Sequence, residues 1–199
     1  MKSQVVSEYG QPLTELEASL PVPVKGEVLV EISHCGVCHS DVHFHDGFFD
    51  FGDGNKLDTS GKPLPLTLGH EIAGTVVAVG PDVKTIKVGD TKVVYPWIGC
   101  GDCTMCNRGD EHLCNARALG VNLPGGFSTH CVVPNEKYCL DAGNIPIDLA
   151  STYMCSGITA YSALKNFVGM SPDEDILIIG LGGVGMMAVE FALAMFDRP

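Results

Sequence analysis

Four cysteines lie close together in the middle of the chain and could bind one metal ion. They are Cys100, Cys103, Cys106 and Cys114. Two residues separate neighbouring members of the first three, so a tight turn can direct their thiolates toward one point. The seven residues before Cys114 let the chain return and place a fourth thiolate. Four sulfur ligands without an open position are typical of structural Zn²⁺, so this spacing predicts a structural zinc site.

Other interpretations of these cysteines are weaker. Disulfides are disfavoured because the total of nine cysteines is odd and no secretory leader is recognised. An iron–sulfur cluster stays open, although the usual bacterial run has a shorter last gap followed by proline, where this chain has Asn115. A thioredoxin-like redox pair would use only two of the four. Cys35, Cys131 and Cys139 have no ligand-like spacing and are predicted to be packing residues.

Residues 33–47 hold a second group of chemically useful side chains, with two cysteines, four histidines and two aspartates. For any single residue, a polar loop with one buried cysteine is the simpler interpretation, but it does not explain the cluster. Cys38, Ser40, Asp41 and His43 fit a short helical turn. Such a turn would present a thiolate, a hydroxyl and an imidazole close together.

His70 and Glu71 open an apolar segment further along the chain. A single histidine before a strand is usually an ordinary hydrogen-bonded core residue. Here a carboxylate follows it and Cys38 offers a second soft ligand upstream, so metal binding stays open beside the packing role.

A nucleotide-binding fingerprint lies near the end of the sequence. Glycines at 180, 182 and 185 form G-x-G-x-x-G, which is weak alone and stronger between a strand and a helix. The apolar run 175–179 predicts a strand buried on both faces, and a helix is expected from Val184 to about Phe196. The glycines would make the turn, admit a pyrophosphate and allow close helix–strand packing. Packing alone remains the other interpretation.

The fingerprint is incomplete within this chain. It needs an acidic residue about 20 positions further on to bind the adenosine ribose. The chain ends at Pro199, before that position. The sequence therefore predicts the N-terminal portion of a longer protein, with no turnover by residues 1–199 alone. The last helix is expected to expose Met186, Val189 and Leu193.

The elements that position these residues are expected to be mostly strands, because 24 glycines and 12 prolines favour a turn-rich β architecture. The predicted strands cover residues 25–32, 68–80, 92–95 and 127–133. A long loop is expected between His43 and Pro65, and one helix from Met154 to Val168.

Composition argues against several classes of partner. A net charge of −12 and a pI near 4.8 disfavour nucleic acid and anionic membranes. Residues 176–196 are almost wholly apolar, but four glycines near their start and Glu190 disfavour a membrane span. Nine cysteines without a leader predict a soluble protein of the reducing cytoplasm.

Five motifs follow one another along the chain: GVCHSDVH, GHEIAGTVVAVG, CGDCTMCNRGDEHLC, CSGIT and GLGGVG. Their order and approximate spacing resemble those of the zinc-dependent medium-chain alcohol dehydrogenases. The resemblance covers nearly the whole chain. It implies a mainly β GroES-like catalytic domain over residues 1–150 and the start of an α/β Rossmann cofactor-binding domain over residues 151–199.

The resemblance implies two zinc ions, one catalytic and one structural. Cys38, His70 and Cys155 would bind the catalytic ion and leave its fourth position to water or substrate, as a Cys₂His site does. Glu71 corresponds to an inner-sphere or alternate ligand, and Asp41 to the carboxylate that orients the zinc-bound histidine. The four-cysteine group would hold the structural ion.

Further roles follow from the same resemblance. Ser40 and His43 look like the relay that carries the alcohol proton outward. His39 stands where the family often has arginine against the cofactor pyrophosphate, which is a departure from the common pattern. Thr159 and Val184 match positions that pack on the nicotinamide ring. Cofactor contacts are also implied for Gly180, Gly182, Gly183 and Gly185.

The implied activity is hydride transfer between an alcohol and NAD, with NADP left open, and it interconverts an alcohol with an aldehyde or ketone. Trp97 is expected to form a wall of the substrate pocket. A homo-oligomer is expected of the full-length protein. A polyol or other medium-chain dehydrogenase stays open, as does a non-catalytic GroES-like fragment that zinc only stabilises.

Overall fold

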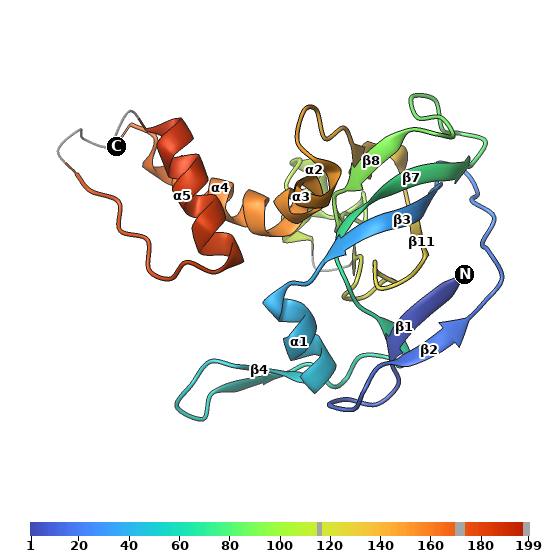
Figure 1. Ribbon diagram of the computed structural model, residues 1–199, viewed down its shortest axis with the longest axis horizontal. Coiled ribbons are helices and arrows are strands. Elements are labelled where there is room, and N and C mark those ends of the chain that lie inside the picture. Colours follow the sequence, from blue (N-terminus) through green and yellow to red (C-terminus); the bar gives the residue numbers. More distant parts are fainter. Residues whose placement is uncertain (115–116, 170–173, 197–199) are drawn as a thin grey trace.

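An antiparallel five-stranded sheet forms the main body of the protein (Figure 1). The computed structural model describes residues 1–114, 117–169 and 174–196. The strands, in their order across the sheet, are β11 (His130–Val133), β3 (Val28–Gly36), β7 (Glu71–Val79), β8 (Thr91–Val94) and β12 (Cys139–Leu140). Val28, Val30, Ile72 and Val76, on β3 and β7, are fully buried in its core. Each contributes about 2 kcal/mol through apolar burial.

Smaller β units surround this sheet. A three-stranded sheet has the order β2 (Thr14–Glu17), β1 (Lys2–Val6) and β6 (Leu66–Thr67). The amide of Gln4 donates to the carbonyl of Phe127 at 2.7 Å, which joins this sheet to the segment before β11. Two further antiparallel pairs are β4 (Phe48–Asp50) with β5 (Lys56–Asp58), and β9 (Trp97–Ile98) with β10 (Arg117–Ala118).

The helices divide between the sheet and a separate helical region. Those of the described residues are α1 (His39–Asp46), α2 (Thr104–Asn107), α3 (Ile147–Thr152), α4 (Ile158–Leu164) and α5 (Gly183–Met195). Short 3₁₀ turns cover Glu111–Leu113, Glu136–Tyr138 and Lys165–Phe167. Helix α3 packs on β3 and β7, whereas α4 and α5 pack on each other away from the sheet (Figure 1). Within the described residues, no helix combines the length and apolarity that crossing a membrane requires.

The loop predicted between His43 and Pro65 is wrong in part, because it contains the β4–β5 hairpin. Residues 52–54, Gly-Asp-Gly, have φ angles of 83°, 50° and 80°, and this left-handed run reverses the chain. The amide of Phe51 donates to the carbonyl of Asn55 at 2.9 Å across the turn. The sequence pattern did not indicate these strands, because the aromatic residues of the segment do not alternate strictly with polar residues.

The helix predicted from Met154 to Val168 begins earlier and is interrupted. The helical path runs from Ile147 to Phe167, with a π-helical turn at Tyr153–Gly157 between α3 and α4. Pro146 stands at the helix N-cap, where its lack of an amide hydrogen is tolerated. The π-helical turn contains Cys155, which is buried.

The strand predicted at 175–179 is absent from the described structure. Leu177 is 83% exposed and Ile179 is 89% exposed. A strand buried on both faces needs a hydrogen-bonded neighbour on each edge, and no described strand pairs with this segment. The helix after it starts within one residue of the prediction. It exposes Met186 and Leu193 as expected, whereas Val189 is partly buried.

Four glycines, at positions 69, 120, 125 and 126, meet beside His70 and allow backbone segments to approach closely. The amides of Gly125 and Gly126 donate to the carbonyls of Thr67 and Gly69 at 2.9 and 2.7 Å. A Cβ at position 125 would lie 2.2 Å from the carbonyl oxygen of Gly69 and 2.4 Å from the Cα of Gly120. Both contacts are with backbone atoms, so neither neighbour can rotate away.

We expect Gly125→Ala to destabilise the protein by about 1–3 kcal/mol, because the added methyl group overpacks this junction. Urea unfolding followed by circular dichroism measures the effect. Gly61→Ala is the matched control, since a Cβ there meets no atom within 4 Å. Equal midpoints for the two variants would show that the junction relaxes without cost.

Candidate metal centres

Three side chains from distant parts of the chain meet at one buried point. Cys38 is the N-cap of α1, His70 directly precedes β7, and Cys155 lies in the π-helical turn. Their ligand atoms all lie within 4.8 Å of one another. The Sγ of Cys155 is 3.2 Å from Nε2 of His70 and 3.9 Å from Sγ of Cys38.

This geometry fits a tetrahedral metal ion. With zinc–sulfur bonds of about 2.3 Å, tetrahedral angles place two sulfurs about 3.8 Å apart and a sulfur and a nitrogen about 3.6 Å apart. Cys38, His70 and Cys155 form what we call the three-donor cluster. The distances between their ligand atoms agree with these values within a few tenths of an ångström. Two thiolates and an imidazole leave one position of a tetrahedron open.

Asp41 fixes the orientation of two members of the three-donor cluster. Its Oδ2 accepts from the amide of Cys38 at 2.9 Å, and its Oδ1 accepts from the amide of Gly69 at 3.1 Å. The same Oδ1 lies 3.3 Å from Nδ1 of His70, which leaves Nε2 directed at the sulfurs. The carboxylate is buried, as are His70 and Cys155. A carboxylate behind a metal-bound histidine typically sets its tautomer and ring orientation.

The three donors of the cluster share protons among themselves. Hydrogen bonds from Cys155 and His70 lower the pKa of Cys38 to about 3, so this residue is a thiolate. Burial lowers the pKa of His70, but Asp41 and Cys38 outweigh that effect and raise it to about 9. The hydrogen bond with Cys38, together with burial, raises the pKa of Cys155. A divalent cation would replace the shared protons and hold both sulfurs as thiolates.

Glu71 lies beside the three-donor cluster without belonging to it. Its Oε1 accepts from the hydroxyl of Ser156 at 2.9 Å and from the amide of Ser156 at 3.3 Å. Burial raises the pKa of Glu71, and these two hydrogen bonds oppose the effect.

The predicted relay residues follow Cys38 on α1. Ser40 is near enough to Cys38 for its hydroxyl to contribute to the lowered pKa of that thiol. The ring of His43 stacks on His39 with centroids 4.7 Å apart, and it lies 4.5 Å from the ring of Phe49 in β4. The β4–β5 hairpin therefore supports the predicted relay histidine, a contact that the sequence did not reveal.

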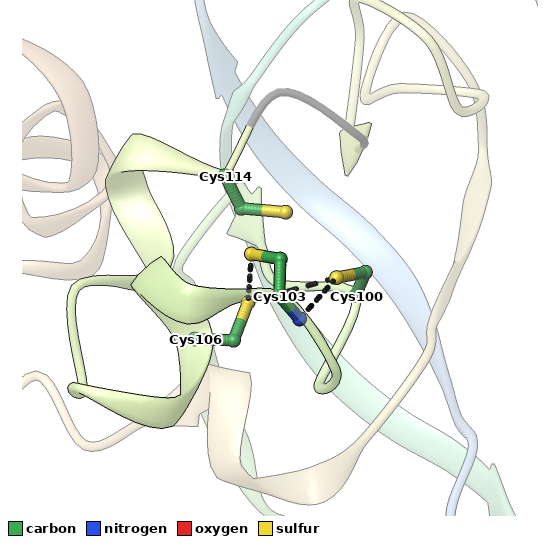
Figure 2. A group of neighbouring side chains, drawn as sticks. All are labelled: Cys100, Cys103, Cys106 and Cys114. Atoms are coloured by element: carbon green, nitrogen blue, oxygen red, sulfur yellow. Dashed lines mark hydrogen bonds between the residues drawn. The ribbon is translucent and has the colours of Figure 1, made fainter.

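The four-cysteine group forms a second, separate cluster (Figure 2). Its sulfurs lie within 4.8 Å of one another. The Sγ of Cys106 is 3.6 Å from that of Cys103 and 3.9 Å from that of Cys100, close to the separation in a tetrahedral zinc site. Backbone hydrogen bonds from Asp102 and Cys103 lower the pKa of Cys100 to about 6. These features fit a closed four-sulfur site.

This knuckle, residues 99–114, is attached to the sheet through Glu111. The Oε2 of Glu111 accepts from the Tyr138 hydroxyl at 2.7 Å, and Oε1 accepts from Lys137 at 2.5 Å. The amide of Gly99 donates to the same Tyr138 oxygen at 3.2 Å. No sequence pattern indicates this connection.

The glycine fingerprint forms a tight turn before α5. Gly180 has a φ of +91°, and a Cβ at position 185 would lie 2.0 Å from the Gly180 carbonyl oxygen. Both positions therefore require glycine. Gly182 is the helix N-cap, and Gly183 and Val184 begin the helix. The predicted turn and helix are present, although the strand before them is not.

A profile of the family described as "Alcohol dehydrogenase GroES-like domain" matches residues 24–144. This chain belongs to that family. The predicted zinc-dependent alcohol dehydrogenase family and its mainly β GroES-like fold are thereby confirmed.

Several relatives and solved structures resemble nearly the whole of this alcohol dehydrogenase family member. The NAD-dependent alcohol dehydrogenase of Saccharolobus solfataricus is 39% identical over 197 residues, which are 98% of this chain and 56% of the relative. The acetophenone reductase of Geotrichum candidum, solved with NAD, has a TM-score of 0.83 and 32% identity over 98% of this chain and 55% of its own. A cobalt- and zinc-bound alcohol dehydrogenase of Pyrobaculum aerophilum has a TM-score of 0.82 and 30% identity, with 98% and 57% covered. The chain thus spans about half the length of its relatives.

A cavity of about 510 Å³ in this family member is connected to the three-donor cluster through one wall residue, Trp97. Trp97, Thr159 and Ile158 line it, and Tyr95 forms part of its wall. The Trp97 ring is 6.0 Å from that of His70, centroid to centroid. The structure therefore brings Trp97 and Thr159, singled out in the sequence, to one cavity, and Trp97 is the residue that links it to the candidate metal site.

Proposed function

We propose that this chain supplies the zinc-binding part of an oxidoreductase that transfers hydride between an alcohol and a nicotinamide cofactor, interconverting the alcohol with an aldehyde or ketone. The meeting of Cys38, His70 and Cys155 at one open-sided point carries this proposal. A protein that used metal only for stability would need the knuckle alone. Relatives named as NAD-dependent alcohol dehydrogenases support the assignment.

The roles of individual residues follow from their positions. Zinc held by Cys38, His70 and Cys155 would act as a Lewis acid and lower the pKa of the alcohol near it. Asp41 keeps the His70 ring in place through Nδ1. Ser40 and His43 would accept the alcohol proton and pass it away from the site, with His43 supported by the Phe49 ring.

The cofactor is proposed to be NAD, bound at the glycine turn. The close Gly180–Gly185 approach leaves backbone at the start of α5 free to meet a pyrophosphate. His39 on α1 would add a side chain to the pyrophosphate, and Thr159 and Val184 would contact the nicotinamide ring. The substrate's organic group would occupy the cavity at Trp97 and Tyr95.

Metal stoichiometry tests the proposal directly. We expect two zinc ions in the wild-type chain and one in Cys38→Ala, because that change removes a ligand of the three-donor cluster alone. Elemental analysis of both proteins gives the answer. One zinc in both would support a GroES-like module that metal only stabilises, and iron would support an electron carrier.

The partners, assembly and cellular compartment of the protein are part of the same proposal. Small alcohols or carbonyl compounds are its partners, and a homo-oligomer is proposed for the complete enzyme. All nine cysteines are free, and six of them lie in the two metal-binding groups. This use of thiols supports a reducing compartment such as the cytoplasm.

A further inference from the structure

The cavity that Trp97 links to the three-donor cluster combines aromatic surface with hydrogen-bond donors. Its volume of about 510 Å³ lies in the range of sites for small organic molecules. Tyr95 and Trp97 supply aromatic rings, and Lys165 and His112 supply an ammonium group and an imidazole ring. The chain has 24 acidic residues, yet none is among the described residues that line this cavity. The lining therefore suits a ligand that carries a ring and an anionic group.

The two nitrogen-bearing side chains of the cavity have no partners of their own. Over residues 1–114, 117–169 and 174–196, no hydrogen bond or ion pair involves the Lys165 ammonium or the His112 ring. By contrast, Lys137, beside the same knuckle, is paired with Glu111 at 2.5 Å. An ammonium group that faces a cavity without a carboxylate is available for a charge-assisted hydrogen bond to a ligand.

Helix α4 sets the distance between the two ends of the cavity. Ile158 and Lys165 both line it and stand about two helical turns apart, roughly 10 Å along the axis. Ile158 begins α4 directly after the π-helical turn that holds Cys155, so its end lies nearer to the three-donor cluster. Lys165 begins the 3₁₀ turn at the other end. A ligand that spans this length needs its reacting group and its anionic group on opposite sides of a rigid spacer such as a benzene ring.

The knuckle holds His112 at the cavity. His112 lies in the 3₁₀ turn Glu111–Leu113. Both carboxylate oxygens of Glu111 are bound, one by the hydroxyl of Tyr138 at 2.7 Å and the other by Lys137. Because its neighbour is anchored to the sheet, the His112 ring is kept at the wall of the cavity. An imidazole ring offers at least one N–H donor in either protonation state.

We infer that this cavity binds an aryl alcohol, or the corresponding aryl aldehyde or ketone, that carries an anionic group such as a carboxylate on the far side of its ring. The inference rests on the proposed function and names its class of substrate. The ring packs on Tyr95 and Trp97, and the anionic group accepts from Lys165 and His112. The hydroxyl or carbonyl group lies at the Ile158 end, nearest the three-donor cluster. Lys165 is then a specificity-determining residue.

Trp97 is the only tryptophan of the chain, so tryptophan fluorescence reports on this cavity. The zinc-loaded chain is titrated with 4-(hydroxymethyl)benzoate and with a neutral counterpart, 4-methylbenzyl alcohol. We expect both compounds to change the emission of Trp97. The anionic compound should bind about two- to five-fold more tightly, the gain expected of a solvent-exposed ion pair. Lys165→Gln should abolish this difference and leave the affinity for the neutral alcohol unchanged.

Lys87→Gln is the matched control, because it removes the same charge from an exposed lysine that does not line the cavity. It should keep the wild-type preference for the anionic compound. Equal affinity of wild type for the two compounds would overturn the inference, as would a preference that Lys165→Gln retains or that Lys87→Gln also loses. An unchanged Trp97 emission with both compounds would overturn it as well. All these results leave the proposed hydride transfer standing, since that proposal is tested by the zinc content of wild type and Cys38→Ala.

Discussion

Replacing Asp41 with alanine is expected to weaken metal binding at the three-donor cluster by about 10- to 100-fold. The carboxylate accepts from the amides of Cys38 and Gly69 and lies 3.3 Å from Nδ1 of His70. Loss of the carboxylate therefore disturbs the ligand Cys38, the segment before the ligand His70 and the ring of His70 together. A chromophoric chelator that competes for the zinc ion of the three-donor cluster, the ion expected to be absent from Cys38→Ala, measures the change in affinity.

The same substitution should also reduce stability, because it leaves buried donors without a partner at about 1–3 kcal/mol each. Asp46→Ala is the matched control on the same helix. Its side chain is 41% exposed and pairs with His45 at 2.8 Å, away from the cluster. Asp41→Asn keeps one acceptor oxygen and should give an intermediate affinity. Equal zinc retention by Asp41→Ala and Asp46→Ala would show that the carboxylate does not organise the site.

Sequence patterns predict well where the geometry is local. The four cysteines fall within fifteen residues, so their spacing alone limits how the thiolates can meet. The structure brings all four together. The glycine turn is another local case, because φ at Gly180 and the close contact at Gly185 are both set within one short segment.

The three-donor cluster could not be derived from spacing. Cys38 and Cys155 are 117 residues apart, and only the β3–β7 pairing and the helical path through the π-helical turn bring them together. The prediction that these three residues share a metal ion came from the resemblance to the alcohol dehydrogenase family. The contact of Ser156 with Glu71 had one weak signal, the position of Ser156 next to Cys155.

The error at residues 175–179 has a related cause. An apolar run without alternation indicates a strand buried on both faces, but the pattern does not contain the neighbouring strands. Leu177 and Ile179 remain exposed among the described residues. The sequence pattern therefore identified an apolar segment correctly, but the pairing of this segment with neighbouring strands was predicted wrongly.

Removing one ligand from the knuckle should have the largest effect on structure. We expect Cys103→Ala to lose one zinc ion and to unfold residues 99–114, while the five-stranded sheet keeps its protection from hydrogen exchange. Structural zinc contributes about 10–16 kcal/mol of binding free energy in small domains, and that energy is available only to the folded knuckle. Helix α2 has four residues, too few for a stable helix by itself.

Little else holds the knuckle in place. Cys100 is exposed, and the other three cysteines are only partly buried. The hydrogen bonds of Glu111 to Tyr138 and Lys137 attach the knuckle to the sheet, but each contributes about 1–3 kcal/mol at most. That is too small to replace the metal. Since His112 lines the cavity beside Trp97, unfolding of the knuckle should also open the proposed substrate pocket.

Hydrogen exchange read by mass spectrometry, together with zinc analysis, tests this prediction in one sample. Cys139→Ala is the matched control: it removes a buried thiol from β12 but no ligand of either cluster. It should keep both zinc ions and a protected knuckle. If the knuckle of Cys103→Ala exchanged as slowly as that of Cys139→Ala, packing against the sheet rather than the metal would be what folds residues 99–114.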